Sequence, residues 1–453
     1  MPNQVLYLIR ATSRPSQVST AVGNIRSSTI GQFVSIRDQK GSAEMSIIMT
    51  IRAIEDNQAE ASAAQCLTKV SGRKVEFDYL RAFAIVLVLW DHAILAYTKY
   101  AFINFENPIA NSNPVVNEQR WLGFDLIVAF NETFFMPLLF FVSGMFVWRS
   151  LARKGWRKYL GGRLTRLGLP FVIGVLFLIP LAYYPAQLQL GLITGVDISY
   201  GAFWLGMVRS GFGTAGPLWF LWLLLTFNCL AALLYIVSFS SGGFIRKRLT
   251  IILDRPVAFF GTLLGISIAV YLPIAIIFGP QEWIGIGPFN AQDSRILLYF
   301  VYFLAGTMVG ACGFECSVFR SEGALAKRWW VWLAVGLISF IVFIIMLVVV
   351  SDIDRTIVGE IAFVVCCWAT VFGMIGLFLR FAKRPMGVFD SLSENGYGIY
   401  VVHYVFVTWL QYLLLGSNLH PIVKGIVVFL CTLILSWGSV AAIRRIPAVA
   451  KVI

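Results

Sequence analysis

Long apolar runs constrain this chain more than any other feature of its sequence. Each is close to the ~20 residues that a helix needs to cross a hydrocarbon core of ~30 Å. Beyond residue 70 we count ten such runs, at about 79–98, 124–148, 167–187, 217–239, 257–279, 296–313, 329–350, 357–379, 396–415 and 421–443. The repetition predicts an all-α polytopic membrane protein, because a spanning helix satisfies its backbone hydrogen bonds within itself.

Composition agrees with this fold class. Hydrophobic residues make up 58% of the 453 residues and charged residues only 13%, whereas soluble domains carry ~25% charged residues. The seven cysteines show neither a disulfide nor a zinc-binding pattern. Cys312 and Cys316 could share a helix face, but two thiols alone make a poor metal site. We therefore expect no metal centre.

Basic residues are enriched in every second connection between the runs. The rich connections carry them within 73–74, 149–163, 246–255, 320–328, 380–384 and 444–451, and the poor ones only at Lys99, Arg120, Arg209, Arg295 and Arg355. Because cytoplasmic loops are enriched in lysine and arginine, the alternation predicts that both termini are cytoplasmic. The net charge of +13 then indicates contact with anionic lipid and not with nucleic acid.

The segment 1–70 differs from the rest of the chain. Its stretch "RATSRPSQVSTAVGNIRSSTIGQ" is polar, rich in serine and threonine, and without hydrophobic periodicity. Such a composition predicts a disordered or weakly ordered extension, and Met45 is an alternative translation start. A single transmembrane domain is expected over 71–453.

The first apolar run, "DYLRAFAIVLVLWDHAILAY", carries Asp78, Arg81, Asp91 and His92. On a helix Arg81 and His92 lie on one face, ~20° from alignment and ~16 Å apart along the axis. Asp78 can pair with Arg81 three residues later. Asp91 points ~100° away from His92 and is expected to face another neighbour, although a bond between them would raise the pKa of the imidazole.

Two interpretations of these polar groups stay open. Arg81 is either an interfacial anchor or part of a polar path, and His92 is either a packing residue or functional. Ionisable groups within membranes are rare and usually line a cavity, which favours function. The ninth run adds His403 at a similar depth, sharing a face with Tyr397 and Tyr400; this cluster could also be structural. His420 is expected to be an ordinary loop residue.

Three further motifs carry polar or small residues. In "FNETFFMPLLFFVSGMF", Glu132 is expected near the outer surface, solvated or close to His92, while Ser143 and Gly144 would allow close helix packing. Arg163 and Arg166 share a helix face at the inner surface, suited to phosphate or to anchoring. The run that begins "GPLWFLWLLL" opens with Trp219 and Trp222, typical of an interfacial aromatic belt.

Taken together, the motifs resemble the acyltransferase-3 family of integral membrane acyltransferases. The likeness rests on Asp78-x-x-Arg81 with His92, "FFVSGMF", Arg163-x-x-Arg166 with Pro170, "LWFLWLL" and "YGIYVVHYVF", across about 74–447. The arginine pair and the ending "IYVVHYVF…SNLHPIVKGIVVFLCTLIL…RRIPAV" resemble the corresponding motifs of family members that succinylate periplasmic glucans. One departure is the string from Glu132 to Pro137, where members often carry a histidine and a basic residue.

The resemblance implies an O-acyltransferase of the bacterial inner membrane. It would move a succinyl or acetyl group from cytoplasmic acyl-CoA, a co-substrate and not a bound cofactor, to a hydroxyl of an extracytoplasmic glycan. The implied catalytic residues are His92, Glu132 and His403, and the implied substrate- and donor-binding residues are Asp78, Arg81, Ser143, Gly144, Arg163, Arg166, Trp219 and Tyr400. A secondary transporter is the alternative, although no internal repeat between the two halves of the chain supports it. Neither the acyl group nor the oligomeric state follows from the sequence.

Overall fold

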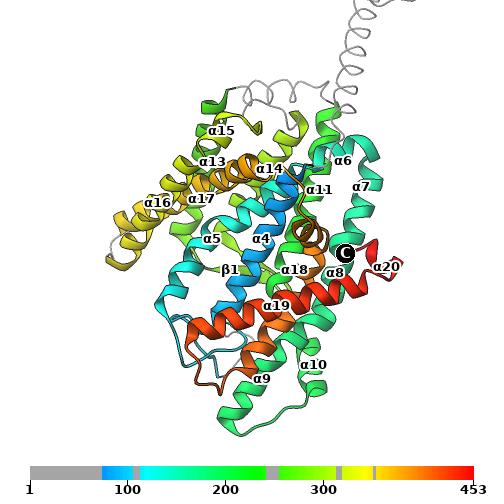
Figure 1. Cartoon of the computed structure of the whole chain (residues 1–453), viewed down its shortest axis with the longest axis vertical. Coiled ribbons are helices and arrows are strands. Elements are labelled where there is room, and N and C mark those ends of the chain that lie inside the picture. The colour runs from blue at the N-terminus through cyan, green and yellow to red at the C-terminus, as the bar shows by residue number, and fades with distance from the viewer. Residues whose placement is uncertain (1–73, 106–112, 241–254, 313–318, 350–352) are drawn as a thin grey trace, which may run out of the picture. The chain divides into compact units, whose positions relative to one another are not determined.

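The computed structural model describes residues 74–105, 113–240, 255–312, 319–349 and 353–453. These residues form helices and one β-hairpin (Figure 1). The predicted extension 1–70 and its possible start at Met45 lie outside them, so both stay predictions.

The elements follow one another in this order. The first part contains α4 (Val75–Ile94), η2 (Leu95–Tyr97), α5 (Leu122–Gly144), α6 (Val147–Lys154), α7 (Trp156–Arg163), η4 (Leu164–Gly168), α8 (Leu169–Ile173), η5 (Gly174–Leu178), α9 (Ile179–Thr194), α10 (Tyr200–Arg209), η6 (Gly216–Leu218) and α11 (Trp219–Ser240). The second part contains α13 (Pro256–Phe278), β1 (Trp283–Ile286), β2 (Phe289–Gln292), α14 (Asp293–Cys312), α15 (Ala324–Lys327), α16 (Trp329–Val349), α17 (Ile353–Phe381), α18 (Gly387–Leu413), α19 (Pro421–Ile443) and α20 (Pro447–Ala450).

Nine helical segments among the described residues are long and apolar enough to cross a membrane. They coincide with nine of the ten predicted runs and confirm a mostly helical, multi-pass membrane protein. The remaining run, 396–415, lies within α18, which has 27 residues. Polar side chains such as Asn395, His403 and Gln411 make α18 less apolar than the other nine. The placement of both termini in the cytoplasm stays a prediction.

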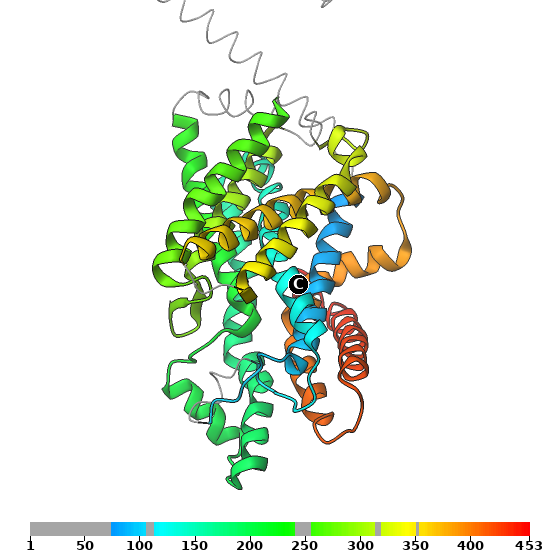
Figure 2. The same ribbon diagram turned by 90° about the vertical axis from the view of Figure 1, so that its left-hand side faces the viewer.

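Helix α18 is the element around which the site is built. It packs against α4, α9 and α19, and α4 also contacts α19. Figure 2 shows blue α4 beside red α19. A second group of contacts joins α14 to α5, and the consecutive helices α16 and α17 pack along each other.

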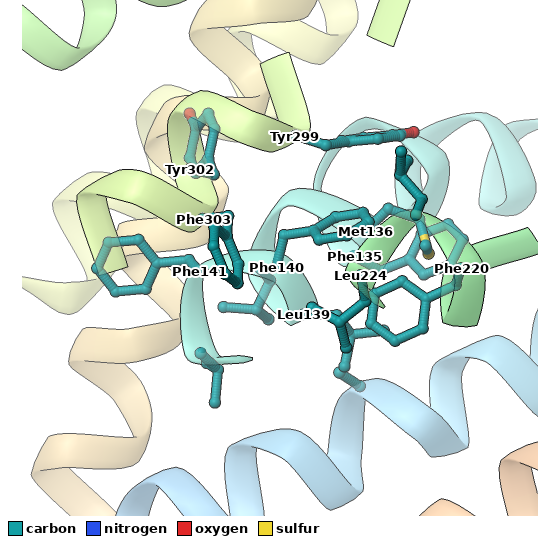
Figure 3. Packing of buried hydrophobic residues seen from close by; sticks show 14 of the residues in the cluster. Phe135, Met136, Leu139, Phe140, Phe141, Phe220, Leu224, Tyr299, Tyr302 and Phe303 are labelled. Carbon is teal, nitrogen blue, oxygen red and sulfur yellow. The ribbon is translucent and has the colours of Figure 1, made fainter. Parts of the chain in front are cut away.

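Helices α5 and α14 approach each other closely through glycine. A Cβ atom at Gly144 would clash with the backbone of Phe303, and one at Gly306 would clash with the carbonyl oxygen of Phe141. Aromatic rings fill the space beside this contact: Phe140 stacks on Tyr299 with centroids 5.1 Å apart (Figure 3). The close packing expected at Gly144 is therefore confirmed.

Three prolines interrupt the long helical segment that runs from α7 to α9. Because proline has no N–H, each leaves the carbonyl four residues earlier without its usual helical donor. For Pro170 this carbonyl belongs to Arg166, which accepts a hydrogen bond from Tyr397 Oη. The two π-helical turns η4 and η5 lie in the same segment, where such turns accommodate irregular hydrogen bonding.

The same compensation occurs at the other two prolines. Pro180 frees the carbonyl of Leu176, which accepts from Trp204 Nε1 at 2.9 Å. Pro185 frees the carbonyl of Leu181, which accepts from Trp409 Nε1 at 3.0 Å. Since Tyr397 and Trp409 both belong to α18, these bonds hold the bent segment against the central helix.

The hairpin β1–β2 was not predicted. It pairs Trp283 with Gln292 and Ile286 with Phe289 in antiparallel register. Its turn contains Gly287 at φ +57°, a conformation that glycine adopts without steric cost. The hairpin leads directly into α14 and so lies next to its first turn.

Candidate active site

His92 of α4 and His403 of α18 meet inside the bundle. Their ring centroids lie 5.2 Å apart, with the rings edge to face at 74°. The His403 side chain is fully buried, and that of His92 is half-buried. The sequence places the two histidines at a similar depth in separate helices, and the structure brings their rings into contact.

Hydrogen bonds define which nitrogen of each ring is available. His92 Nδ1 lies 2.7 Å from the carbonyl oxygen of Val88, and His403 Nδ1 lies 2.6 Å from that of Tyr400. A carbonyl oxygen only accepts, so Nδ1 carries the proton in each neutral ring and Nε2 is the basic nitrogen. His403 Nε2 is buried and has no hydrogen-bond partner among the described residues. The pair therefore presents two basic nitrogens to any substrate that reaches it.

Tyrosines surround the histidine pair. Tyr400 donates from Oη to the carbonyl of Pro217 in η6, just before α11, and its ring centroid lies 5.8 Å from that of His403. The ring of Tyr404 lies 5.2 Å from His92 and 6.0 Å from Tyr183. Sequence reasoning missed Tyr404. Its position four residues after Tyr400, on the face already recognised, was a usable signal.

Gln411 of α18 closes the C-terminal end of α4. Its Nε2 donates to the carbonyls of His92 at 2.8 Å and Ala93 at 3.2 Å. These carbonyls belong to the last turn of α4, where intrahelical donors run out. Gln411 Oε1 in turn accepts from Asn113 Nδ2 at 3.0 Å. The fully buried amide thus links the backbone of His92 to the loop before α5.

Asp91 faces α5 and not the imidazole that follows it in sequence. Its Oδ1 accepts from Asn131 Nδ2 at 2.8 Å, and both residues are buried. Asn131 is therefore the neighbour, other than His92, that Asp91 was expected to face. The competing prediction, a bond from Asp91 to His92, is wrong because the helical rotation between consecutive residues turns the carboxyl toward α5.

Glu132 pairs with an arginine instead of joining the histidines. Its Oε2 lies 3.7 Å from Arg295 Nη1, and the same nitrogen reaches the Glu132 carbonyl at 3.5 Å. Among the described residues Glu132 forms an ion pair with Arg295 and none with His92. One of the two arrangements expected from the sequence, a contact between Glu132 and His92, is therefore not formed. The other expectation, a solvated carboxylate, agrees with a side chain that is 41% exposed.

Asp78 and Arg81 form the predicted pair at the start of α4. Arg81 Nη2 lies 3.5 Å from Asp78 Oδ1. The carbonyl of Asp78 also accepts from Ser393 Oγ at 3.3 Å. Ser393 and Tyr397 stand one turn apart on α18, so the backbones of Asp78 and Arg166 attach to neighbouring turns of that helix.

Arg163 and Arg166 of the third run lie in different surroundings, whereas a straight helix would place them on one shared face. The guanidinium of Arg163 lies 5.1 Å above the ring of Tyr159 and is half-buried, whereas Arg166 is exposed. The π-helical turn η4 begins between them. It adds a residue to the turn and so changes the spacing on which a shared face depended.

The remaining predicted residues lie in packing contacts. Ser143 is half-buried beside Gly144 at the α5–α14 contact. Trp219 stacks on Tyr299 with centroids 5.8 Å apart, and Trp222 donates from Nε1 to the carbonyl of Asn290 at 3.3 Å. Both tryptophans therefore make specific contacts in addition to any role in an aromatic belt.

A family model described as an acyltransferase domain matches residues 74–441. The chain belongs to the acyltransferase-3 family. No curated protein and no solved structure matches it. The resemblance inferred from the motifs is thus confirmed at the level of the family, and the protein is a membrane-bound acyltransferase.

Family membership gives the histidine pair a chemical context. Acyl transfer to a hydroxyl requires that a proton be removed, and a neutral imidazole with a free Nε2 does this well. The described residues contain no group of three or more metal-binding side chains. Of the cysteine pair considered above, Cys312 is half-buried in α14, and Cys316 lies outside the described residues.

Replacing Gln411 with leucine is expected to lower kcat of this acyltransferase about tenfold with little change in KM. The substitution removes both hydrogen bonds to the end of α4, each contributing ~1 kcal/mol, and frees the backbone of His92 to move. Steady-state kinetics of the purified protein measure the effect, with Gln281→Leu at an exposed position as the control. An unchanged kcat would show that Gln411 does not position His92.

Proposed function

We propose that this acyltransferase moves an acyl group from cytoplasmic acyl-CoA to a hydroxyl of an extracytoplasmic glycan in the bacterial inner membrane. A succinyl group and a periplasmic glucan are the first candidates for donor group and acceptor. The observation that supports this most is the contact of His92 with His403, with a basic Nε2 on each ring. A fully buried imidazole in contact with a half-buried one is expensive to maintain in a membrane bundle unless the pair serves a function.

In this mechanism His92 is the general base. Its Nε2 takes the proton of the acceptor hydroxyl while the oxygen attacks the thioester carbonyl. The tetrahedral intermediate then collapses to the ester and expels the CoA thiolate, which receives the proton from His92. The bond from Nδ1 to the Val88 carbonyl keeps the ring in the required tautomer and stabilises the imidazolium formed in between.

A route through an acyl-histidine uses the same atoms. Here His92 Nε2 attacks the thioester carbonyl and CoA leaves as the thiolate. The acceptor hydroxyl then attacks the carbonyl of the acyl group on Nε2, which forms the ester and restores neutral His92, and the hydroxyl proton passes to the CoA thiolate. His403 has the same role in both routes: its unpartnered Nε2 accepts a hydrogen bond from a substrate hydroxyl. That bond satisfies a buried polar atom that otherwise carries a desolvation cost.

The donor is proposed to bind at the start of α4. Arg81 lies on the same helix as His92 and ~16 Å from it along the axis, a length comparable with the pantetheine arm of CoA. Arg166 attaches through its carbonyl to Tyr397, one turn along α18 from the serine that holds Asp78. Arginine suits phosphate groups because its planar fork donates two parallel hydrogen bonds.

Replacing Arg166 with glutamine is therefore expected to raise KM for acyl-CoA about tenfold, the effect of losing one charge-assisted hydrogen bond. The penalty should shrink as ionic strength rises, because salt screens exposed charges. Arg445→Gln, also exposed, is the matched control and should change KM less than twofold. Equal effects of the two variants would indicate a general electrostatic attraction and no phosphate site at Arg166.

Mass spectrometry of envelope and periplasmic glycans tests the proposed function. Cells that lack the protein should lose one acyl mass increment from one glycan, and re-expression should restore it. The mass difference identifies the acyl group, and the fraction that changes identifies the acceptor. No acyl difference in any glycan fraction would overturn the proposal.

A further inference from the structure

Glu132 is exposed at a depth where lipid would not accept it. It lies ten residues into α5, which spans the membrane, yet its side chain is 41% exposed. Charged side chains within a membrane face a water-filled or protein-lined space, because contact with hydrocarbon costs several kcal/mol. The carboxylate of Glu132 therefore faces a space that water or a polar ligand reaches.

Arg295 forms the buried wall of this space. Its side chain is 8% exposed, its guanidinium lies 5.0 Å above the ring of Phe363, and Nη1 reaches Glu132. Its Nε is buried and has no hydrogen-bond partner among the described residues. The ion pair at 3.7 Å is a single long contact, so Glu132 keeps free lone pairs and the guanidinium of Arg295 keeps unsatisfied donor capacity.

The neighbours of Glu132 place this space on the side of the loop that follows α4. Tyr100 of that loop lies near the carboxylate: desolvation first, and then the negative charge of Glu132, raises the pKa of the phenol. Asn131, the preceding residue of α5, is bonded to Asp91, which precedes His92. The carboxylate thus stands at the level of the histidine pair and toward the end of α4 where the predicted topology places the exterior.

A series of contacting aromatic rings leads from Arg295 toward the histidines. Arg295 interacts with Tyr299, on which Trp219 stacks. Trp219 follows Pro217, the residue that holds Tyr400, by two positions. Trp283 of the hairpin lies edge-on to Trp219 with centroids 6.1 Å apart and is 52% exposed. Polar groups at one point and flat apolar faces beside them are features of small-molecule sites.

We propose that Glu132 and Arg295 form the acceptor subsite, which binds adjacent hydroxyls of a neutral glycan. The inference rests on the proposed function. Glu132 accepts from one hydroxyl, Arg295 donates to the next, and Trp219 and Trp283 contact the apolar face of a sugar ring. Glu132 and Arg295 carry opposite charges, so the pair has no net charge. A neutral pair that offers both an acceptor and a donor suits an uncharged acceptor such as a sugar hydroxyl.

The test is steady-state kinetics of the full-length protein in lipid nanodiscs, with acyl-CoA as donor and a neutral gluco-oligosaccharide as acceptor. Glu132→Gln is expected to raise KM for the oligosaccharide about tenfold or more, because a charge-assisted hydrogen bond is lost. KM for acyl-CoA should change less than twofold. Glu118→Gln, an exposed carboxylate of the loop before α5, is the matched control and should leave both KM values unchanged.

Three outcomes separate the two proposals. If the wild type transfers no acyl group to any oligosaccharide, the proposed function fails. If it does, but Glu132→Gln leaves the acceptor KM unchanged, the subsite is wrong while the function stands. Glu132→Gln leaves the buried charge of Arg295 without its partner, which destabilises a protein. The double variant Glu132→Gln/Arg295→Gln therefore tests folding: a well-folded double variant should keep the raised acceptor KM, and recovery of the wild-type value would overturn the subsite.

Discussion

Replacing His92 with alanine is expected to lower acyl transfer at least ~100-fold, the contribution of a positioned general base. The variant loses the imidazole that α4 contributes to the pair, and with its Nε2 the proton acceptor in one route and the nucleophile in the other. Release of CoA thiol from acyl-CoA in the presence of acceptor measures the effect. Because the half-buried ring is anchored by one bond to its own helix, its removal should leave the fold intact.

The third histidine provides the matched control for this experiment. His420 accepts a hydrogen bond from the Ile422 amide through Nδ1 and so caps α19, which makes it more than the ordinary loop residue expected from the sequence. His420→Asn keeps a capping side chain and should retain wild-type activity. Comparable losses in both variants would show that the loss at His92 reflects general damage and not catalysis.

Replacing Gly306 with valine is expected to cost at least ~3 kcal/mol of stability, the upper range for overpacking. A side chain there meets the carbonyl of Phe141 and the amide of Met145 on α5, and backbone atoms of a packed helix cannot move aside as a flexible side chain does. The helices would have to separate, which would also open the aromatic core beside them. Thermal unfolding of the purified protein in detergent, followed by circular dichroism, measures the loss.

Gly261→Val separates this packing effect from helix propensity. Gly261 lies within α13, also a membrane-spanning helix, and a Cβ there would have nothing within 4 Å. The two substitutions change the same residue type in the same kind of helix. We expect the midpoint of Gly261→Val to stay within a few degrees of the wild type. A similar drop in both variants would show that the cost comes from the β-branched residue and not from the α5–α14 contact.

The membrane-spanning helices were predictable because their signal is local. Length and apolarity of a run are properties of consecutive residues, and so is the pairing of Asp78 with Arg81 one turn later. Helix α18 shows the limit of this signal. It is long enough to span a membrane but contains polar residues such as Asn395 and Gln411. The sequence shows that these residues are unusual in such a helix, but it does not show what they contact.

The irregular segment from α7 to α9 was predictable only in part. Pro170, Pro180 and Pro185 each predict a free carbonyl four residues earlier, because proline has no N–H to donate to it. The donors that satisfy these carbonyls come from residues far away in sequence, Tyr397 and Trp409 among them. No sequence pattern predicts which distant donor will bind a given free carbonyl.

The helices, the family and the helix faces that Arg81, His92, Tyr400 and His403 occupy can therefore be read from consecutive residues. Which faces meet depends on the folded bundle, where His92 meets His403, Asp91 meets Asn131 and Glu132 meets Arg295. The physical reason is that helical periodicity fixes the direction of a side chain around its own axis, whereas the choice of neighbouring helix depends on packing over the whole bundle.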